Sequence, residues 1–451
     1  MKPDKYQKAA ILETGNCLLL AGAGSGKTFT IVEKINYLVT SNICTSSEIL
    51  VISFTNKSVN DLKKKIKYPC QIFTFHKLAL HILKMYNQNF SLAPSNLLDY
   101  VAKEVFLSLS ETKLQEELKS YFHVKTYNQI FASKDFKDFQ KIIITTIKLL
   151  KTTNTSKDIL KSSYKENSIL TKYALIIQKI YETELKSCGK KDLDDIIIDA
   201  SNILDKNLGY KYIIIDEFQD TSPIRFNLIY KIFSLSKAKI FAVGDDYQSI
   251  YHFTGCNLDI FLNFPKLIPN TKVLKLETTY RFSQNLIDIV TKFITKNPKQ
   301  LGKNIKSPSQ LSNPIEFIYY LNSHKAFEKI YQKLKKEKQS FFVLGRNTFD
   351  IKNFTSKAIP EFLTVHSSKG LEAKNVIIIN LSNNKNGFPS QVVNHKILEI
   401  LHPSDTSYLY AEERRLFYVA LTRTQNKVYL LVPYFKKSIF IKELKKIIKS
   451  L

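Results

Sequence analysis

The 451-residue chain has few cysteines and no long apolar run. No apolar run approaches the twenty residues that a membrane-spanning helix needs, and the first five residues lack the apolar core of a signal peptide. We therefore expect a cytoplasmic protein without membrane association. The eight histidines show no metal-ligand spacing. The cysteines are odd in number and form no C-x-x-C pair, which excludes a disulfide framework or a zinc site as the organising element; they are Cys17, Cys44, Cys70, Cys188 and Cys256.

Acidic residues are scarce relative to basic ones. The chain has 40 Asp and Glu against 67 Lys and Arg, a net charge of +27. This excess favours a polyanionic partner, most simply nucleic acid. An AT-rich genome is a second explanation, because its codons raise Lys, Asn and Ile together, and all three are abundant here. Charge alone therefore leaves nucleic-acid binding open.

Short apolar runs alternate with helical stretches along most of the chain, which is typical of α/β units around parallel sheets. Residues 87–187 differ, because they are rich in Lys, Leu and Ile, have helical periodicity and show no strand signal. We predict a first α/β domain of residues 1–86 and 188–276, a helical insertion of residues 87–187, and a second α/β domain of residues 277–451. The predicted strands are Cys17–Leu20, Ile49–Ser53, Tyr212–Ile215, Ile240–Val243, Val376–Asn380 and Val428–Val432.

A glycine-rich turn, AGAGSGKTFT, follows the first apolar run and precedes a helical pattern. It fits the P-loop pattern G-x-x-x-x-G-K-[ST], with Ala21 at the first glycine position. Backbone N–H groups of such a loop, with the following helix N-terminus, cradle phosphates. Lys27 would reach the β- and γ-phosphates, and Thr28 would bind Mg²⁺. The candidate nucleotide-binding residues are Ala21, Gly22, Ala23, Gly24, Ser25, Gly26, Lys27 and Thr28.

A second acidic element stands in the stretch YIIIDEFQD. Asp216 and Glu217 come at the carboxyl end of a predicted strand, where α/β sheets bind ligands. Asp216 would hold Mg²⁺ through water, and Glu217 would accept a proton from the attacking water. Solvated turns also end strands with acidic residues, but the P-loop beside them favours nucleotide hydrolysis. Gln248, just past the next strand, is a candidate γ-phosphate sensor or an ordinary loop glutamine.

These motifs, in this order, resemble the superfamily 1A helicases of the UvrD/Rep/PcrA type. The resemblance covers nearly the whole chain, and several motifs match over eight or more residues. Beside the P-loop and the acidic strand end, the matching stretches are YQKAA, ISFTNKSVNDL, FTFHKLA, DLDDII, LETTYRFSQNL, LTVHSSKGLEAKNVII and EERRLFYVALTR.

The resemblance implies two RecA-like P-loop motor domains (1A and 2A), a helical insertion (1B) in the first, and ATP with Mg²⁺ as cofactors. It implies that Gln7 reads the adenine edge, Tyr280 stacks on the base and Glu372 touches the ribose. Arg281 and Arg423 would reach the γ-phosphate from the second domain and, with Glu217 and Gln248, form the catalytic set. Either arginine taken alone is equally explained as a surface ion pair.

The resemblance also implies a single-stranded DNA track of backbone donors and aromatic platforms. Most of the 30 Phe and 24 Tyr must lie in the core, so a core position is the alternative for each aromatic member of this set. The matching positions are Phe54, Thr55, Asn56, Phe75, His76, Tyr251, Phe253, Arg346, His366 and Tyr418.

The chain departs from the family pattern in three places. Phe29 stands where many relatives have an arginine beside the base, and is still expected to pack on it. His252-Phe253-Thr254-Gly255 replaces Gly-Trp-Arg-Gly, which reduces the stacking face and removes a cation. Sixteen residues separate Arg346 from Leu363, too few for the mobile subdomain 2B that relatives insert there. We expect a motor that hydrolyses ATP and translocates but unwinds poorly alone.

The leading interpretation is an ATP-dependent DNA helicase or translocase that moves 3′→5′ on single-stranded DNA or at single-strand/duplex junctions. The alternative is a DNA-activated nucleotidase in an anti-phage complex, like the helicase-like component of Gabija, with a separate nuclease. A repair protein is another possible partner. A degenerate motor used as a nucleic-acid clamp is disfavoured, because every catalytic position is filled.

Overall fold

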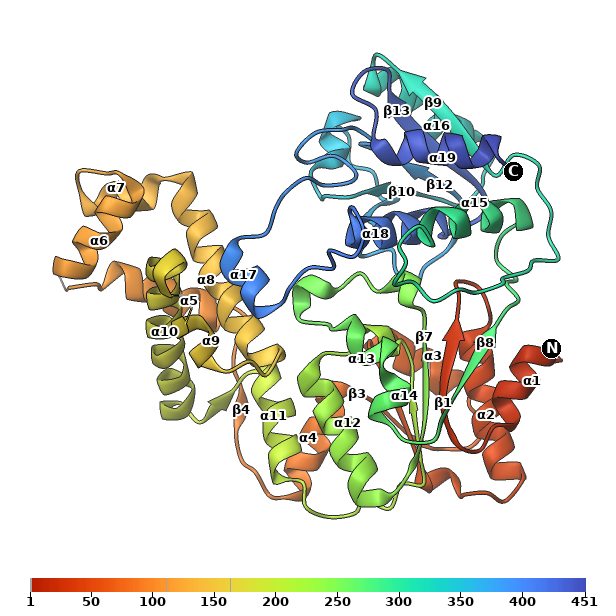
Figure 1. Ribbon diagram of the computed structural model, residues 1–451, viewed down its shortest axis with the longest axis horizontal. Coiled ribbons are helices and arrows are strands. Elements are labelled where there is room, and N and C mark those ends of the chain that lie inside the picture. The colour runs from red at the N-terminus through yellow and green to blue at the C-terminus, as the bar shows by residue number, and fades with distance from the viewer. Residues whose placement is uncertain (1, 111, 163) are drawn as a thin grey trace.

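The computed structural model describes residues 2–110, 112–162 and 164–451. Two parallel sheets, one above the other in Figure 1, organise the chain. The predicted α/β class is confirmed. The first sheet has the order β3-β2-β6-β7-β1-β8. Its strands are β1 (Asn16–Ala21), β2 (Ile49–Ser53), β3 (Gln71–Thr74), β6 (Tyr212–Ile215), β7 (Lys239–Gly244) and β8 (Thr271–Leu276).

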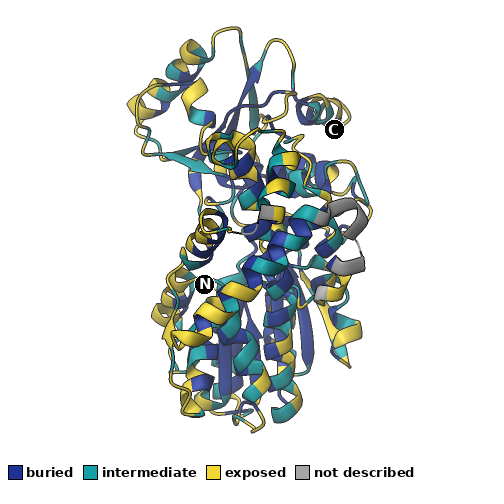
Figure 2. Cartoon of the chain, turned by 90° about the vertical axis from the view of Figure 1, so that its left-hand side faces the viewer, coloured by how far each residue is buried: buried dark blue, intermediate teal, exposed yellow. Residues whose placement is uncertain are grey.

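Helices cover both faces of the first sheet, which is why β1, β2 and β6 are apolar and buried throughout. The buried strands stand out inside their helices in Figure 2. One face packs against α1 (Lys5–Leu12), α2 (Lys27–Thr40) and α3 (Asn56–Lys65). The other packs against α4 (Phe75–Met85), α11 (Leu193–Ile203), α12 (Pro223–Ser236), α13 (Leu258–Leu262) and α14 (Phe264–Leu267).

The second sheet has the order β11-β10-β12-β13-β9. Its strands are β9 (Ile315–Tyr320), β10 (Phe341–Gly345), β11 (Phe362–Thr364), β12 (Ala373–Ile378) and β13 (Thr424–Pro433). On one face lie α15 (Gln284–Ile294), α18 (Ala411–Leu421) and α19 (Ile439–Lys449), and on the other lies α16 (Ser323–Lys336). The connection from β10 to β11 holds only a short 3₁₀-helix, Asp350–Asn353, so no domain is inserted there.

A helical arm projects to one side of the first sheet (Figure 1) and has its own core. It comprises α5 (Leu97–Leu107), α6 (Thr112–Phe122), α7 (Tyr127–Ala132), α8 (Lys134–Thr152), α9 (Lys157–Ser162) and α10 (Tyr164–Ser187). The prediction of no strand in residues 87–187 is wrong at one point. β4 (Ser91–Leu92) pairs there with β5 (Lys190–Lys191) at the base of the arm.

Five of the six predicted strands fall within observed ones, and the sixth overruns at one end. The predicted strand Val376–Asn380 overruns, because β12 ends at Ile378 and Asn380 has a positive φ of 56°. Within the described residues, no helix is long and apolar enough to cross a membrane, and no cluster of three potential metal-ligating side chains occurs. All five cysteines are free thiols.

Candidate nucleotide site and nucleic-acid interface

The P-loop turns from β1 into α2 with two glycines in the left-handed region. Gly24 has φ 73° and Gly26, the N-cap of α2, has φ 81°. A Cβ atom on Gly24 would lie 2.4 Å from Cβ of Arg281, so this glycine permits close approach of the second domain. Ala21, by contrast, ends β1 in extended, fully buried backbone. The missing first glycine of the motif therefore costs no conformational freedom.

The acidic pair stands directly after β6, facing the P-loop. Lys27 Nζ lies 3.0 Å from Glu217 Oε1, and Glu217 itself has a positive φ of 53°. Non-glycine residues in this region carry backbone strain, which concentrates at functional sites. Burial, reinforced by the neighbouring Glu217, raises the pKa of Asp216. Burial opposes ionisation of Glu217 too, but Lys27 and Lys369 outweigh it and hold the Glu217 pKa below its usual range.

Lys369 connects this pair to the second domain and was not predicted as a site residue. Its ammonium pairs with Asp220, lies 4.0 Å from Glu217 Oε2 and donates to the Gln248 carbonyl at 2.7 Å. Burial raises the pKa of Asp220 to about 6. The signal was present in the sequence, because Lys369 lies inside the matched stretch LTVHSSKGLEAKNVII.

The two arginines reach the cleft from the second domain. Arg281 Nε lies 2.6 Å from Glu372 Oε2, and its Nη1 donates to the Thr422 carbonyl at 3.3 Å. Arg423 is buried, and its Nη2 donates to Gln248 Oε1 at 3.0 Å. Burial, and then the nearby Arg281, lowers the pKa of Arg423 to about 9. It therefore remains a cation at neutral pH.

A cavity of about 580 Å³ lies between these groups. Residues of the P-loop and of the second domain both line it. The predicted residues that line it are Gly24, Ser25, Gly26, Lys27, Thr28, Phe29, Asp216, Glu217, Gln248, Tyr280, Arg281, Glu372 and Arg423. Gly22 and Ala23 lie behind the loop beside Ile305 and Thr279, outside this lining.

Gln7 also lies behind the P-loop rather than in the cavity wall. Its Nε2 donates to the Ser25 carbonyl at 3.1 Å, and its Oε1 accepts from the Asp4 N–H at 3.1 Å as part of the α1 capping box. Tyr280, half exposed, donates from its hydroxyl to Asp4 and from its N–H to the Gly24 carbonyl. The structure thus gives Gln7 a role in supporting the loop.

Three predicted DNA-binding residues form an aromatic cluster between the two domains. Phe253, 61% exposed, meets His366 edge-on at 5.4 Å, and Tyr251 lies 6.4 Å from the same ring. The Tyr251 hydroxyl donates to the His366 carbonyl at 3.1 Å. Burial, with help from Arg346 and Lys369, lowers the pKa of His366 to about 4, so its ring is neutral at physiological pH.

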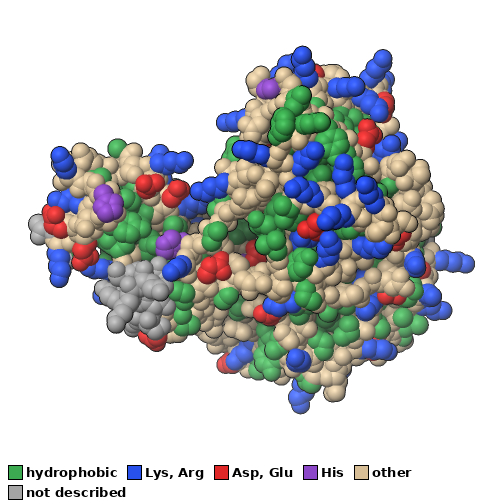
Figure 3. Space-filling model, turned by 45° about the horizontal axis from the view of Figure 1, so that its top comes forward, with side chains coloured by type: hydrophobic (Ala, Val, Ile, Leu, Met, Phe, Trp, Pro, Cys, Tyr) green, Lys and Arg blue, Asp and Glu red, His purple; other side chains and the backbone are tan. Residues whose placement is uncertain are grey.

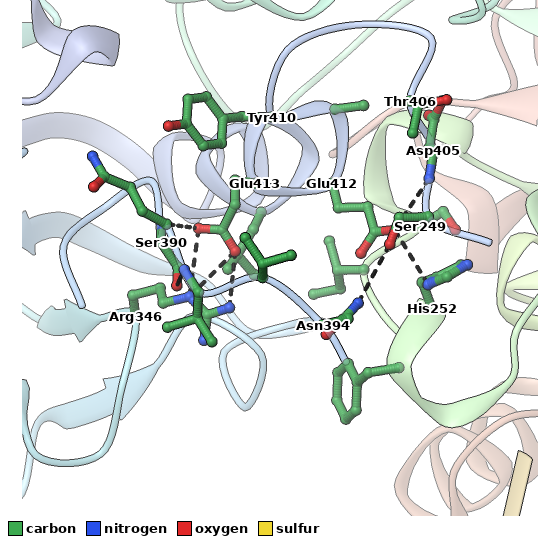
Figure 4. A pocket seen from close by; sticks show the side chains of 18 of the residues that line it. Ser249, His252, Arg346, Ser390, Asn394, Asp405, Thr406, Tyr410, Glu412 and Glu413 are labelled. Carbon is green, nitrogen blue, oxygen red and sulfur yellow. Dashed lines mark hydrogen bonds and ion pairs between the residues drawn. The ribbon is translucent and has the colours of Figure 1, made fainter. Parts of the chain in front are cut away.

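A second cavity, of about 810 Å³, adjoins this cluster. Phe253, Arg346 and His366 are among the residues that line it. Figure 4 shows Arg346 at this cavity. Arg346 is held by Glu413, with Nη2 2.9 Å from Oε1. Lys and Arg side chains outnumber Asp and Glu on the face shown in Figure 3, in keeping with a polyanionic partner.

The other predicted contacts lie at the ends of β2 and β3. Thr55 caps α3 and Asn56 opens it, both exposed. Phe54 presents its ring beneath the Arg225 guanidinium at 4.6 Å, a cation–π contact that was not predicted. His76 is neutral at physiological pH, because burial lowers its pKa to about 4.

Two aromatic predictions need correction. Tyr418 is 1% exposed and packs edge-on against Tyr247 at 5.3 Å in the core, so its ring is not available to a base. Phe75 is also buried and supports Phe54 edge-on at 6.1 Å. Both residues occupy positions that match the family pattern, but their rings pack in the core.

Comparison with known proteins agrees with this geometry. Residues 3–269 match the UvrD/REP helicase N-terminal domain, and residues 350–434 match the UvrD-like helicase C-terminal domain. DNA helicase IV of Escherichia coli (strain K12) is 28% identical over 97% of this chain and 69% of its own length. A probable DNA helicase II homologue of Mycoplasma capricolum is 31% identical over 66% of this chain and 42% of its own length. The ATP-dependent DNA helicase Rep of Escherichia coli is 28% identical over 67% of this chain and 44% of its own length. The N-terminal match alone spans more than half of the chain, which therefore belongs to the UvrD/Rep family of ATP-dependent DNA helicases.

Proposed function

We propose that this chain hydrolyses ATP in the 580 Å³ cleft and uses the energy to move 3′→5′ along single-stranded DNA. The observation that carries the proposal is the composition of the cleft. The P-loop and acidic pair come from the first domain, and Arg281, Glu372 and Arg423 come from the second. A triphosphate there would be contacted by both domains, so hydrolysis would be coupled to their relative movement. The polarity rests on the family resemblance alone.

The chemical roles follow from the ion pairs in the cleft. Phosphate oxygens would compete for Lys27 and release Glu217, which would take a proton from the attacking water. Arg281 and Arg423 would donate to the charge that develops on the γ-phosphoryl oxygens. Gln248 stands beside Arg423 and would orient the water. The arginines act only when the cleft is closed.

A magnesium ion fits the oxygen donors present. The Thr28 hydroxyl and the Asp216 carboxylate both line the cleft, and Mg²⁺ takes hard oxygen ligands with several waters. When bound, the ion would neutralise charge between the β- and γ-phosphates. A neighbouring dication would also favour the ionised form of Asp216, whose pKa burial raises in its absence.

The base would lie at the open side of the cleft, between Tyr280 and Phe29. Once Arg281 leaves Glu372 and binds the phosphates, Glu372 would be free to contact the ribose. Gln7 would reach the adenine edge only if one of its present bonds to Asp4 or Ser25 were exchanged. The base would then be bound mainly by stacking and not by hydrogen bonds to its edge. We therefore expect GTP to be a usable substrate.

The DNA track would run from Phe54 and His76 on the first domain to Phe253, His366 and Arg346 between the domains. We assign residues 1–86 and 188–276 to domain 1A, 87–187 to 1B and 277–451 to 2A. The β10–β11 connection holds one short 3₁₀-helix where 2B would be inserted. Efficient duplex unwinding is therefore expected to need a partner, either a repair protein or a separate nuclease.

Displacement of streptavidin from single-stranded DNA tests the polarity. The strand carries biotin at one end, and free biotin traps the released streptavidin. A 3′→5′ motor clears the 5′ end with ATP and leaves the 3′ end occupied. Faster clearing of the 3′ end would contradict the proposed direction, and clearing of neither end would contradict translocation.

A further inference from the structure

One segment of the second domain leaves its sheet and crosses to the helical arm. This strap, residues 390–404, connects the region after β12 to α18 and carries the short helix α17 (Lys396–Leu401). Ile397 and Leu401 are buried in the core of the arm, where α17 contacts α8, α9 and α10. Figure 1 shows the two ends of the strap reaching from the second domain to α17 beside α8.

The strap has a second anchor on the first domain. The His402 ring stacks on His252 with centroids 3.7 Å apart and planes 11° apart, and its Nε2 lies 3.0 Å from the Cys256 carbonyl. His252 Nε2 in turn lies 3.1 Å from the Pro403 carbonyl. The strap is thus tied to the loop that presents Phe253. It joins all three parts of the chain.

The 810 Å³ cavity lies between the strap and the proposed DNA track. Phe253, Arg346 and His366 of the proposed track line it. The strap lines the same cavity with Ser390, Gln391, Val392, Val393, Asn394, Glu399 and Ser404. Figure 4 shows Ser390 and Asn394 of the strap around the cavity with Arg346 and His252. A strand stacked on Phe253 would therefore lie against the strap residues that line this cavity.

The chemistry of the walls suits bases better than phosphates. Four carboxylates line the cavity, which disfavours a phosphate there, and each is already engaged by the protein. Glu413 is bound by Arg346, Glu412 by His252, Asp405 by Arg415 and Glu399 by Ser404 and Asn394. The exposed lining combines apolar side chains with uncharged polar ones: Val393 is 86% exposed, Val392 is also exposed, and so are Gln391 and Asn394. Apolar and aromatic surfaces bind the faces of bases without regard to sequence.

We propose that the strap is a DNA-binding element that covers the single strand and converts the track into an enclosed path. The inference rests on the proposed function, because it needs the strand at Phe253. With both ends in the second domain and anchors on the arm and the first domain, the strap leaves a stacked strand no sideways exit. It would confer the retention that a compact motor without an inserted 2B otherwise lacks.

A charge pair at Val393 tests contact between the strap and DNA. Val393→Glu and Val393→Lys are compared with the same two changes at Leu321, which is 79% exposed on the same domain and outside the cavity lining. Dissociation of a fluorescent oligothymidine is followed at low salt. At position 393 the Glu variant should release the oligothymidine at least about threefold faster than the Lys variant, because the introduced charge would lie within a Debye length of the DNA phosphates. At position 321 the two variants should release it at the same rate. Equal ratios at 393 and 321 would overturn the proposal.

A closed circle of oligothymidine tests enclosure with the unaltered protein. A linear strand can thread under the strap, whereas a circle enters only when the strap opens. ATP hydrolysis should therefore start later after mixing with circles than with linear strands of equal length. Equal onset would show an open path and overturn the inference. Absence of stimulation by either strand would instead contradict the proposed function.

Detaching α17 gives an independent check. Ile397→Asp with Leu401→Asp should remove the delay on circles and speed dissociation from linear strands. A thermal melt and hydrolysis at saturating linear strand report whether the motor remains folded. A folded double variant that keeps the delay would contradict the role of the strap.

Discussion

Arg423 Nη2 donates to Gln248 Oε1 at 3.0 Å, and this bond joins the two domains across the cleft. Gln248 is held in turn by Asp245, to which its Nε2 donates at 2.6 Å. All three side chains are buried. A chain of buried polar contacts of this kind has few alternative arrangements, so movement of the second domain must break it. The pair therefore links the catalytic cleft to the position of the second domain.

Arg423→Lys should lower ATP turnover by about a thousandfold, because an arginine that reaches a γ-phosphoryl group contributes on that scale. Lysine keeps the charge but loses the fork that contacts Gln248 and phosphate together. Steady-state hydrolysis with saturating single-stranded DNA measures the effect. The matched control is Arg414→Lys, which removes an equally buried arginine of the same segment whose partner, Glu443, lies outside the cleft. Equal losses in both variants would assign the effect to folding.

Glu217→Gln should lower the rate of ATP hydrolysis at least about a hundredfold and should strengthen nucleotide binding. The reason for the second effect is the 3.0 Å ion pair with Lys27, which competes with phosphates for the ammonium. Titration with a fluorescent ATP analogue measures affinity. Glu361→Gln, which breaks an ion pair with Lys335 outside the cleft, serves as the control. Weaker binding by Glu217→Gln would refute the competition.

Gly24→Ala should block closure of the second domain on the P-loop. The added Cβ would lie 2.4 Å from Cβ of Arg281, and the backbone has φ 73°. Gly209→Ala is matched for backbone strain, because Gly209 has φ 79°, but its Cβ would meet nothing within 4 Å. Both variants should lose about 1–2 kcal/mol of stability, and only Gly24→Ala should lose turnover. Normal hydrolysis by Gly24→Ala would show that the observed approach of the domains is not needed.

Phe253→Ala should weaken single-strand binding by about 1–3 kcal/mol, the usual contribution of one base stacked on an aromatic ring. Phe435→Ala removes a ring that is 72% exposed elsewhere on the second domain and should have no effect. Fluorescence anisotropy with an oligothymidine gives both affinities. Equal affinities of the two variants for the oligothymidine would show that Phe253 is not part of the DNA track.

Acid should destabilise the protein partly through His366. Its folded pKa is about 4, lowered chiefly by burial and further by Arg346 and Lys369, against about 6.5 when unfolded. Between these values the unfolded state binds more protons, so stability falls as pH drops from 6.5 towards 4. His366→Gln should remove up to about 1.4 kcal/mol per pH unit of that slope. Denaturant midpoints at several pH values test this. Identical slopes for both proteins would contradict a buried neutral imidazole.

Continuous apolar runs made most of the central strands predictable. Ile49–Ser53 and Tyr212–Ile215 were predicted with their observed bounds, because strands buried on both faces contain no polar interruption. The strands β8 and β9 at sheet edges were missed, and their side chains are only partly buried. β10 was missed too, although it lies inside the second sheet and is largely buried. Edge strands leave no comparable signal in a single sequence.

Motif residues at strand ends converge because parallel strands share a carboxyl edge. This is why Lys27, Asp216 and Gln248 meet although they are distant in sequence. Aromatic residues carry no such constraint, and Tyr418 and Phe75 serve the core instead of the track. The contact of α17 with the arm was also unpredictable, because a short apolar helix does not reveal which distant surface it covers.

The most direct measurement is ATP hydrolysis with and without a single-stranded oligonucleotide, beside Glu217→Gln. The account predicts strong stimulation by the strand in the unaltered protein and none in the variant. Stimulation would link the cleft to the aromatic track through the domain contacts described. An unstimulated rate in a protein that still binds the strand would contradict a motor driven by ATP in this cleft.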